Sequence, residues 1–344
     1  MTKRLKLLYI PHPYLTNEGF THWGQDIFKA IGNRHEIRTL DKKSPVKPQL
    51  DGIDVVVDLG GEAGSREGVS EERYQLATQL ADASAGKIRL WQIVGTGFEH
   101  FDLDHWKSKG IPVSNTPGQF SAVSLAECAL MFILMLTRKF FVASGNFKKG
   151  LVGEPLGTEL SGLKLGIVGL GASGKELAQR ALAFGMCISA IDIRHVSPEE
   201  IEQFQLEFVG KPEDLDQMIS QSDVLSLHLH VNQETRHLID SRRLSLMKST
   251  ALLINIARVD LVDETALTQA LLEGQIGGAG LDVFSGDGLQ NHDWKAPVYD
   301  LPNVVTTPHI SGVTDGTSRK RAHAVSENVN RIANGLPPLY RIDG

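Results

Sequence analysis

The sequence predicts an α/β protein made of two units, each built on a parallel sheet with helices on its faces. Three observations lead to this fold class. The length of 344 residues exceeds what one hydrophobic core usually supports, and 41% hydrophobic residues suffice to fill two cores. Strand-like and amphipathic helix-like segments alternate along the chain. A glycine-rich turn, LGIVGLGASGKE, lies at 165–176, near the middle of the chain.

The first alternating series occupies roughly the first hundred residues. Helices are expected at 19–32 and 70–86, and strands at 5–10, 35–40, 53–61, 88–97 and 111–118. The most apolar segment, 124–141, follows this series and is interrupted by Glu127, Arg138 and Lys139. Its uncharged part is shorter than the roughly 20 residues that cross a bilayer, so it predicts a helix buried between layers.

The second series begins at the glycine-rich turn. Strands are expected at 163–171, 187–193, 224–230, 251–257, 277–284 and 303–309, with helices at 175–185, 212–221, 241–248 and 263–274. The tail at 326–343 reads as a helix plus an extended end. Because it has no sheet of its own to pack on, we expect it to return to the first unit.

Composition excludes several function classes. The net charge of −6 and the lack of a Lys/Arg cluster argue against a nucleic-acid partner. No export signal and no membrane span are visible. The two cysteines, Cys128 and Cys187, lie in apolar runs and form neither a disulfide framework nor a metal spacing. We therefore expect core cysteines in a reducing, cytoplasmic protein without a bound metal.

The glycine-rich turn predicts a dinucleotide site. Gly169, Gly171 and Gly174 form G-x-G-x-x-G between a strand and a helix, which suits a tight turn, close approach of a pyrophosphate and close helix packing. The same letters also fit a P-loop up to Lys175. A P-loop requires Ser or Thr after the lysine, and Glu176 stands there instead, so we reject that interpretation.

Asp192 supports the dinucleotide interpretation. It lies at the end of the next strand, where a carboxylate accepts hydrogen bonds from the adenosine ribose, although it could also be an ordinary turn residue. A carboxylate there repels a 2′-phosphate, which favours NAD over NADP. Arg194 and His195 follow directly and could hold that phosphate if Asp192 turned aside.

Polar residues lie at the carboxyl ends of three of the later strands. Arg258 could clamp a substrate carboxylate through two hydrogen bonds, the stretch at 278–288 supplies Asp282 and Asp287, and the stretch at 306–312 supplies His309. Each has a plainer explanation: Arg258 as a surface charge, Asp287 as a turn residue and His309 as a loop histidine. Taken together and in this order along the chain, they indicate a shared functional site. His228 and His230 alternate on an expected strand, so a metal site between them is not expected.

These motifs together resemble the D-isomer-specific 2-hydroxyacid dehydrogenase family over nearly the whole chain. The resemblance rests on VGTGFEHFDL, NTPG followed by AE, GLGASG, SLHLHVNQETRHLI, NIARVDLVDETAL, GAGLDVF and LPNVVTTPHISG. It implies a Rossmann, doubly wound NAD-binding domain at 116–307 inserted into a flavodoxin-like α/β substrate domain formed by 1–115 and 308–344. The substrate domain would cover a cleft over the cofactor.

The resemblance also implies residue roles. Arg258 corresponds to the arginine that binds the substrate carboxylate, and His309 to the acid or base at the carbonyl oxygen. A histidine suits both directions because its unperturbed pKa of about 6.5 lies near working pH. The main chain of Thr96 and Gly97 would complete the carboxylate cradle. The expected cofactor-binding residues are Gly169, Gly171, Ala172, Ser173, Gly174, Asp192, His230, Ile256, Arg258 and Asp282, the last holding the nicotinamide carboxamide.

Several positions depart from the family pattern. The expected partner of His309 is Asp287, where the family usually has a glutamate followed by proline; a solvated turn is the alternative. Val259 replaces the usual glycine, His230 a usual proline and Glu99 a usual aspartate. The interval between NTPG and AE is one residue longer. These departures affect cofactor contacts more than the fold.

The function expected is an NAD-dependent oxidoreductase that transfers a hydride between nicotinamide and a small D-2-hydroxy acid or 2-keto acid. The alternative is an NAD-sensing, corepressor-like binding protein of the same fold. A D-3-phosphoglycerate substrate is possible, but the loop at 59–67 offers only Arg66 against two acids, so glyoxylate or hydroxypyruvate is preferred. The resemblance further implies a homodimer joined through the nucleotide-binding domains.

Overall fold

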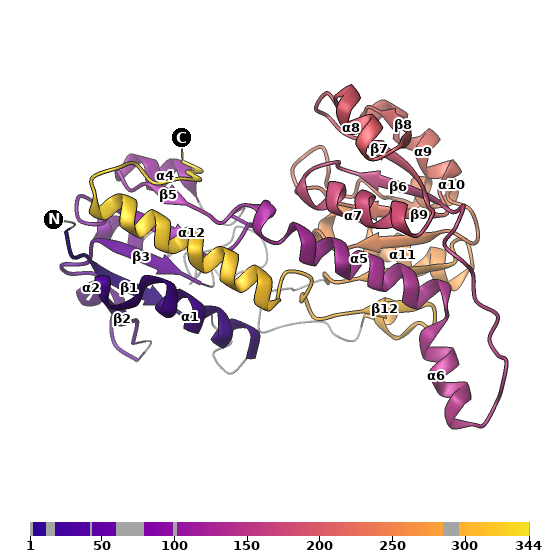
Figure 1. The fold of residues 1–344 in the computed structure, drawn as a ribbon, viewed down its shortest axis with the longest axis horizontal. Coiled ribbons are helices and arrows are strands. Elements are labelled where there is room, and N and C mark those ends of the chain that lie inside the picture. The colour runs from indigo at the N-terminus through magenta and orange to yellow at the C-terminus, as the bar shows by residue number, and fades with distance from the viewer. Residues whose placement is uncertain are drawn as a thin grey trace. The chain divides into compact units, whose positions relative to one another are not determined.

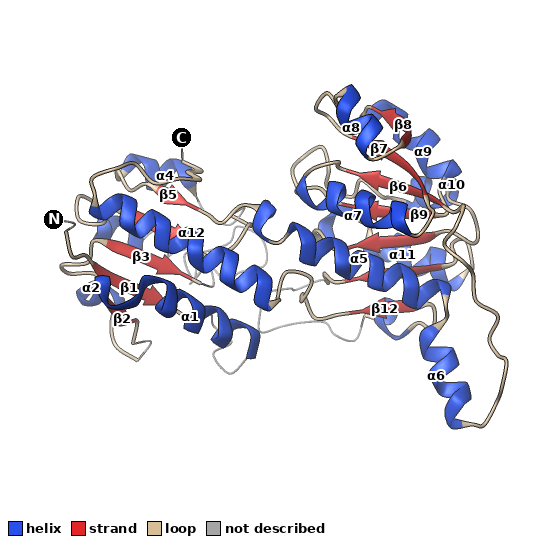
Figure 2. Cartoon of the chain, in the orientation of Figure 1, coloured by secondary structure: helices blue, strands red, loops and turns tan. Residues whose placement is uncertain are grey.

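The computed structural model describes residues 3–11, 18–41, 43–59, 79–98, 102–284 and 296–343. The chain divides into two compact units, drawn in Figure 1. Unit 1 comprises Met1–Phe120 and Val313–Gly344, and unit 2 comprises Ser121–Gly312. Unit 2 is therefore inserted into unit 1, and Figure 2 shows that each unit has helices around a sheet. The predicted fold class is confirmed.

Unit 1 is built on a five-stranded parallel sheet with the order β2-β1-β3-β4-β5, which is the flavodoxin-like order. Its strands are β1 (Lys6–Ile10), β2 (Glu36–Thr39), β3 (Val55–Asp58), β4 (Leu90–Ile93) and β5 (Val113–Ser114). Its helices are α1 (Glu18–Ile31), α2 (Val46–Gln49), a segment at 79–84, α4 (Leu103–Ser108) and α12 (Asp315–Ala333).

Both faces of this sheet are covered, which explains why every residue of the inner strands β3 and β4 is buried. On one face α1 packs beside α12, with Trp23 and Val325 in the same core cluster. On the other face Trp91 packs edge-to-face on Trp106, with ring centroids 4.6 Å apart. The expected return of the tail to the first unit is confirmed, because α12 fills one of these two layers.

Unit 2 is built on a seven-stranded parallel sheet with the order β12-β11-β10-β9-β6-β7-β8. Its strands are β6 (Lys164–Val168), β7 (Cys187–Ile191), β8 (Leu206–Gly210), β9 (Val224–Leu227), β10 (Leu252–Asn255), β11 (Gly278–Leu281) and β12 (Val304–Thr306). Its helices are α5 (Ala122–Thr137), α6 (Phe140–Lys148), α7 (Ala172–Ala183), α8 (Pro198–Gln203), α9 (Leu215–Gln221), α10 (Ser241–Leu246) and α11 (Glu264–Leu272). Strand order reverses between β6 and β9, as in the doubly wound Rossmann fold.

Short 3₁₀ turns connect several elements of both units. They lie at Gly32–Arg34, Gly118–Phe120, Pro212–Asp214, Val259–Leu261 and Pro297–Asp300.

Three sequence expectations need correction. The segment at 124–141 is not one buried helix: α5 ends at Thr137, Lys139 adopts φ 49°, and α6 carries exposed phenylalanines. Helix α8 and strand β8 were missed, although Ser197 and Glu200 form a capping box that marks the start of α8. The strand expected at 224–230 ends at Leu227, so the two histidines beyond it do not alternate on a strand.

Neither a membrane-crossing helix nor a disulfide is found in the described part of the chain. None of the described helices is both long and apolar enough to cross a bilayer. Cys128 and Cys187 are free thiols, and Cys128 is buried. Burial, together with the nearby Asp282 carboxylate, raises the pKa of Cys128 to about 12, so this thiol behaves as a small apolar core residue.

Candidate active site

The glycine-rich turn lies at the point where the strand order of unit 2 reverses. Gly169 follows β6 with φ 97°, and a Cβ there would lie 2.7 Å from the His228 carbonyl oxygen beyond β9. A Cβ on Gly174 would collide with the Gly169 carbonyl, whereas a Cβ on Gly171 would meet nothing within 4 Å. Gly169 and Gly174 thus close the turn against the sheet, and Gly171 leaves its backbone open to a ligand.

Helix α7 begins directly at this open backbone, with Ala172 and Ser173 in its first turn. The Ser173 hydroxyl lies 2.9 Å from Nδ1 of His228, whose Nε2 lies 3.0 Å from the Ser226 hydroxyl. Burial lowers the pKa of His228 to about 4, so its ring is neutral at ordinary pH. A neutral imidazole donates at one nitrogen and accepts at the other. His228 therefore fixes the Ser173 hydroxyl below the turn.

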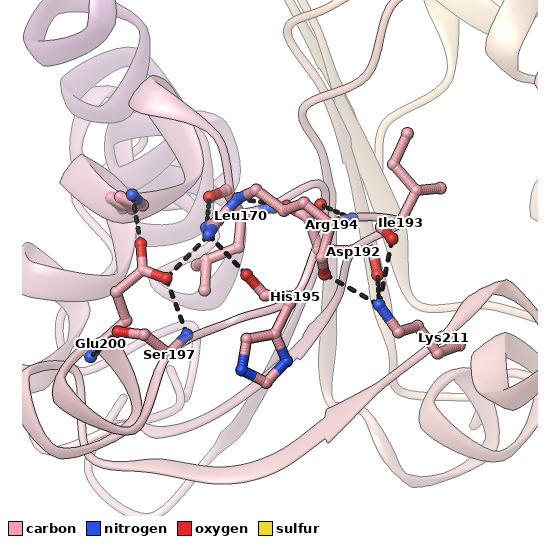
Figure 3. A network of polar contacts seen from close by, with 9 residues as sticks. Leu170, Asp192, Ile193, Arg194, His195, Ser197, Glu200 and Lys211 are labelled. Carbon is pink, nitrogen blue, oxygen red and sulfur yellow. Dashed lines mark hydrogen bonds and ion pairs between the residues drawn. The ribbon is translucent and has the colours of Figure 1, made fainter.

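Asp192 lies beside the same turn at the end of β7. One carboxylate oxygen accepts a hydrogen bond of 2.8 Å from the Leu170 N–H, and the other accepts one of 2.9 Å from the Arg194 N–H. The guanidinium Nε of Arg194 lies 3.4 Å from the first oxygen. Asp192 is thereby held at the rim of the turn, with both oxygens fixed by the surrounding chain (Figure 3).

These groups suit an NAD molecule. The first turn of α7 presents backbone N–H groups where a pyrophosphate binds, and the missing side chain at Gly171 leaves room for it. The fixed carboxylate of Asp192 suits ribose hydroxyls, which donate hydrogen bonds, because each of its oxygens retains acceptor capacity. Of the other expected cofactor residues, Ile256 is buried just after β10, and His230 is exposed beyond β9.

Three of the predicted site residues follow three neighbouring strands of unit 2. Arg258, Asp282 and His309 come after β10, β11 and β12, which pair side by side and in parallel. All three residues therefore lie at the carboxyl edge of the sheet, where ligands of this fold bind. At about 4.8 Å per strand, the axes of β10 and β12 are roughly 10 Å apart. An arginine side chain can span much of that separation.

Arg258 is placed by a turn that the side chain of Asn255 organises. The Asn255 Nδ2 donates to the Arg258 carbonyl at 2.8 Å, and its Oδ1 accepts from the Ala257 N–H at 3.1 Å. The guanidinium itself donates to the Ala257 carbonyl at 2.8 Å. Asn255 is buried and was not singled out in the sequence, although it directly precedes the Ile-Ala-Arg run.

Asp282 holds the segment that carries His309. Its carboxylate accepts hydrogen bonds from the Thr307 hydroxyl at 2.5 Å and from the N–H groups of Ile310 and Ser311, both at 2.8 Å. These donors lie on either side of His309 in the chain. The Asp282 carboxylate is completely buried, and burying a carboxylate is costly unless it accepts hydrogen bonds. Its three donors offset that cost. The sequence predicted contact with nicotinamide for Asp282 and did not predict this anchoring.

His309 has an unusual backbone conformation. Its φ is 53°, in the left-handed region that residues other than glycine adopt uncommonly, although Asn, Asp and His are enriched there, and its side chain is exposed on unit 2. The Ser124 hydroxyl on α5 donates to the Ser311 carbonyl, which anchors the far side of this segment. Strain of this kind persists where the surroundings fix the backbone, and it is frequent at functional sites.

Unit 1 holds the predicted Thr96–Gly97 segment. The Thr96 carbonyl accepts from the Asn115 side chain at 2.9 Å, and the Thr96 hydroxyl accepts from Nη2 of Arg321 at 3.2 Å. Arg321 is buried on α12, with its guanidinium 4.7 Å from the Trp23 ring centre. Burial lowers the pKa of Arg321 to about 10, which leaves it charged. Sequence reasoning missed it because α12 lies 225 residues further along the chain.

Some predicted residues lie outside the part of the chain that the structure describes. These are Asp287, Glu99 and most of the loop at 59–67, including Arg66. The partnership of Asp287 with His309 therefore stays a prediction.

Comparison with known proteins gives three results. A family model for the D-isomer specific 2-hydroxyacid dehydrogenase NAD-binding domain matches residues 130–311. A glyoxylate reductase of Thermococcus litoralis is 38% identical over 265 residues, covering 74% of this chain and 77% of the relative. A D-3-phosphoglycerate dehydrogenase of Methanocaldococcus jannaschii is 33% identical over 73% of this chain and 47% of its own length.

Solved structures agree with this similarity. D-lactate dehydrogenase from Aquifex aeolicus, complexed with NAD and lactic acid, has a TM-score of 0.76 and 26% identity, covering 98% of this chain and 99% of its own. D-lactate dehydrogenase from Lactobacillus jensenii with NAD⁺ has a TM-score of 0.77 and 25% identity over the same shares.

Proposed function

Because the chain belongs to the D-isomer specific 2-hydroxyacid dehydrogenase family, it is an NAD-dependent oxidoreductase of 2-hydroxy and 2-keto acids, and we propose that Arg258 and His309 act directly on a small unphosphorylated substrate. The observation that carries the proposal is the placement of both residues at the carboxyl edge of one parallel sheet, Arg258 after β10 and His309 after β12, with β11 between these two strands. The similarity favours this enzyme over the NAD-sensing alternative.

Arg258 would bind the substrate carboxylate. A guanidinium donates two parallel hydrogen bonds to a carboxylate and so fixes both its position and its orientation. The turn held by Asn255 supports this role, because it fixes the backbone from which Arg258 extends. The main chain of Thr96 and Gly97 in unit 1 would complete the binding of that carboxylate, which makes unit 1 the proposed substrate domain.

His309 would exchange a proton with the substrate oxygen. During reduction its protonated ring donates to the ketone oxygen, and during oxidation its neutral ring accepts the hydroxyl proton. The anchoring of its segment by the buried Asp282 supports a role that demands accurate placement. When bound, the nicotinamide of NADH supplies the hydride that balances this proton. Asp287 is the proposed partner of the His309 ring.

The cofactor would occupy the glycine-rich turn. We assign the pyrophosphate to the backbone of Gly171, Ala172 and Ser173 and the adenosine ribose to Asp192. Supporting observations are the open space at Gly171 and the fixed carboxylate beside it. Gly169, Gly174, His230, Ile256, Arg258 and Asp282 stay in the proposed cofactor-binding set.

We propose glyoxylate or hydroxypyruvate as the substrate in the direction of reduction. Relatives that are 35–38% identical carry the name glyoxylate reductase, which supports a small keto acid. With purified enzyme and NADH, steady oxidation of NADH should follow addition of either acid. The kcat/KM for 3-phosphohydroxypyruvate should be at least about tenfold lower, because a bound phosphate that loses its contacts with water and finds no cationic partner costs roughly 1.4 kcal/mol or more. A higher kcat/KM for the phosphorylated acid would overturn the substrate assignment and leave the enzyme class intact.

We also propose a homodimer that buries α6 and the segment after it. Phe147 on α6 is 84% exposed, and Val152 and Leu156 are 94% and 87% exposed. Figure 1 shows α6 extending away from the sheet of unit 2. A run of large apolar side chains of this extent marks an interaction surface, and a second copy of this chain carries an identical one.

The dimer proposal predicts the effect of one charge. Phe147→Asp should shift the mass measured by light scattering from dimer to monomer, because burying an unpaired carboxylate is unfavourable. Leu272→Asp, at an exposed position at the end of α11, should leave the dimer unchanged. A monomeric wild type, or a dimeric Phe147→Asp variant, would contradict the proposal.

A cytoplasmic location is the remaining proposal. It is supported by the two free cysteines. Recovery of the native protein in an oxidising cell compartment rather than in the cytoplasmic fraction would contradict it.

A further inference from the structure

A network of charged side chains surrounds Asp192 and joins three elements of unit 2. Arg194 follows β7, Glu200 lies on α8, and Lys175 lies in the first turn of α7. Nη1 of Arg194 donates to the Glu200 carboxylate at 2.7 Å, and Lys175 pairs with the other oxygen of the same carboxylate. One anion therefore holds two cations beside the proposed ribose site.

The guanidinium of Arg194 is folded back onto the protein (Figure 3). Nη2 donates to the Leu170 carbonyl at 2.6 Å, and Nε lies 3.4 Å from the Asp192 carboxylate. With Nη1 on Glu200, each nitrogen of the guanidinium has a contact within the protein. Arg194 thus ties the glycine-rich turn to α8 instead of extending beyond Asp192.

A third cation near Asp192 is also engaged. Nζ of Lys211 donates to the carbonyls of Ile193 at 3.0 Å and Arg194 at 2.9 Å, and lies 3.5 Å from the Asp192 carbonyl. Figure 3 shows Lys211 on the side of this segment opposite Glu200. Lys211 fixes the backbone of the segment.

Glu200 holds the side chains of Arg194 and Lys175 in place. The hydrogen bonds from Arg194 and then Lys175 lower the pKa of Glu200 to about 2, so the carboxylate is charged over the whole working range of pH. Glu200 also accepts the Ser197 N–H at 3.1 Å as part of the capping box. Its position is therefore fixed from both sides.

We propose that Glu200 is a specificity-determining residue that excludes NADPH by holding Arg194 and Lys175 away from a 2′-phosphate. The inference rests on the proposed binding of the adenosine ribose at Asp192. Sequence alone left Arg194 free to hold that phosphate; the structure commits it to Glu200. A 2′-phosphate would then meet the carboxylates of Asp192 and Glu200, with both cations already paired.

Removal of the Glu200 charge tests this directly. Glu200→Gln keeps an oxygen that can accept the capping-box hydrogen bond from the Ser197 N–H. It removes the negative charge that now pairs with Arg194 and Lys175. The Kd values of NADH, NADPH and 2′,5′-ADP are measured for the purified protein by calorimetry, without turnover. The ratio of the Kd for NADPH to that for NADH should fall roughly tenfold or more, because opposite charges near a surface attract at contact and are screened at longer range. The Kd for 2′,5′-ADP should fall with it.

The matched control is Glu202→Gln, an exposed position on the same helix with the same change in charge. It should alter the ratio by less than about twofold, since exposed charges at longer range are screened. Adding both Arg194→Met and Lys175→Met to Glu200→Gln should remove the gain. An unchanged ratio in Glu200→Gln, an equal change in both single variants, or a gain that survives the loss of both cations overturns the proposal.

Two further measurements show whether the variant is folded and whether the cofactor binds at Asp192. A thermal unfolding curve shows whether Glu200→Gln is folded, and Glu200→Thr removes the same charge if it is not. If wild type binds NADH but Asp192→Ala binds it equally well, the proposed cofactor site fails. If Asp192→Ala loses NADH binding while Glu200→Gln keeps the wild-type ratio, only the role of Glu200 fails.

Discussion

Replacing His309 by asparagine should lower kcat with NADH and glyoxylate by roughly 10² to 10⁴-fold, the usual contribution of a general acid. Asparagine tolerates the φ of 53° at this position, so the backbone and its bonds to Asp282 should persist. The Kd of NADH, measured by fluorescence titration, should change by less than about threefold. A large fall in kcat with intact cofactor binding then identifies lost proton transfer.

His237 offers a matched control for this variant. It is an exposed histidine with φ 50°, beyond β9, and lies outside the proposed site. His237→Asn makes the same chemical change on the same backbone conformation and should leave kcat within about twofold of wild type. If His309→Asn retains wild-type turnover, His309 is not the proton donor.

Replacing Arg258 by glutamine should lower kcat/KM by roughly 10² to 10⁴-fold. Two hydrogen bonds to a charged group contribute about 1.5–3 kcal/mol each, and every 1.4 kcal/mol is a factor of ten. Arg258→Lys retains the charge but not the paired geometry, so we expect an intermediate loss that is expressed mainly in KM for glyoxylate. Steady-state kinetics at saturating NADH measures both variants.

Arg242→Lys is the control for the lysine variant. Arg242 pairs with Asp216 at the surface of α10, so its replacement should leave both kcat and KM unchanged. Comparable kinetics for Arg258→Gln and wild type would remove the carboxylate-binding role. A loss of NADH affinity equal to the loss of kcat/KM would instead assign Arg258 to the cofactor.

The sequence predicted the two sheets well because their strands are short apolar runs separated by amphipathic helices. It missed β8, an edge strand whose exposed Glu207 breaks the apolar run. It also joined α5 to α6, because hydrophobicity alone does not distinguish apolar side chains buried in the core from apolar side chains exposed at the surface. The break depends on Lys139, a residue type that gives no sign of a left-handed conformation.

The placement of Arg258, Asp282 and His309 after three successive strands was predicted, since motif order fixes which residues follow which strand. Their supporting contacts were not. The bonds from Asp282 to Ile310 and Ser311 cross 28 and 29 residues, and Arg321 reaches Thr96 across 225. Contacts of this kind depend on tertiary packing, which leaves no periodic signal in the chain.

The anchoring of His309 by Asp282 has a consequence for how such an enzyme diversifies. The proposed proton donor, His309, and its anchor, Asp282, belong to the same inserted unit, and Asp282 is completely buried. If unit 1 is the substrate domain, as proposed, substitutions in unit 1 would change which acid is accepted while His309 keeps its place relative to its own strands. Under these proposed roles, selectivity and reactivity would be separable traits.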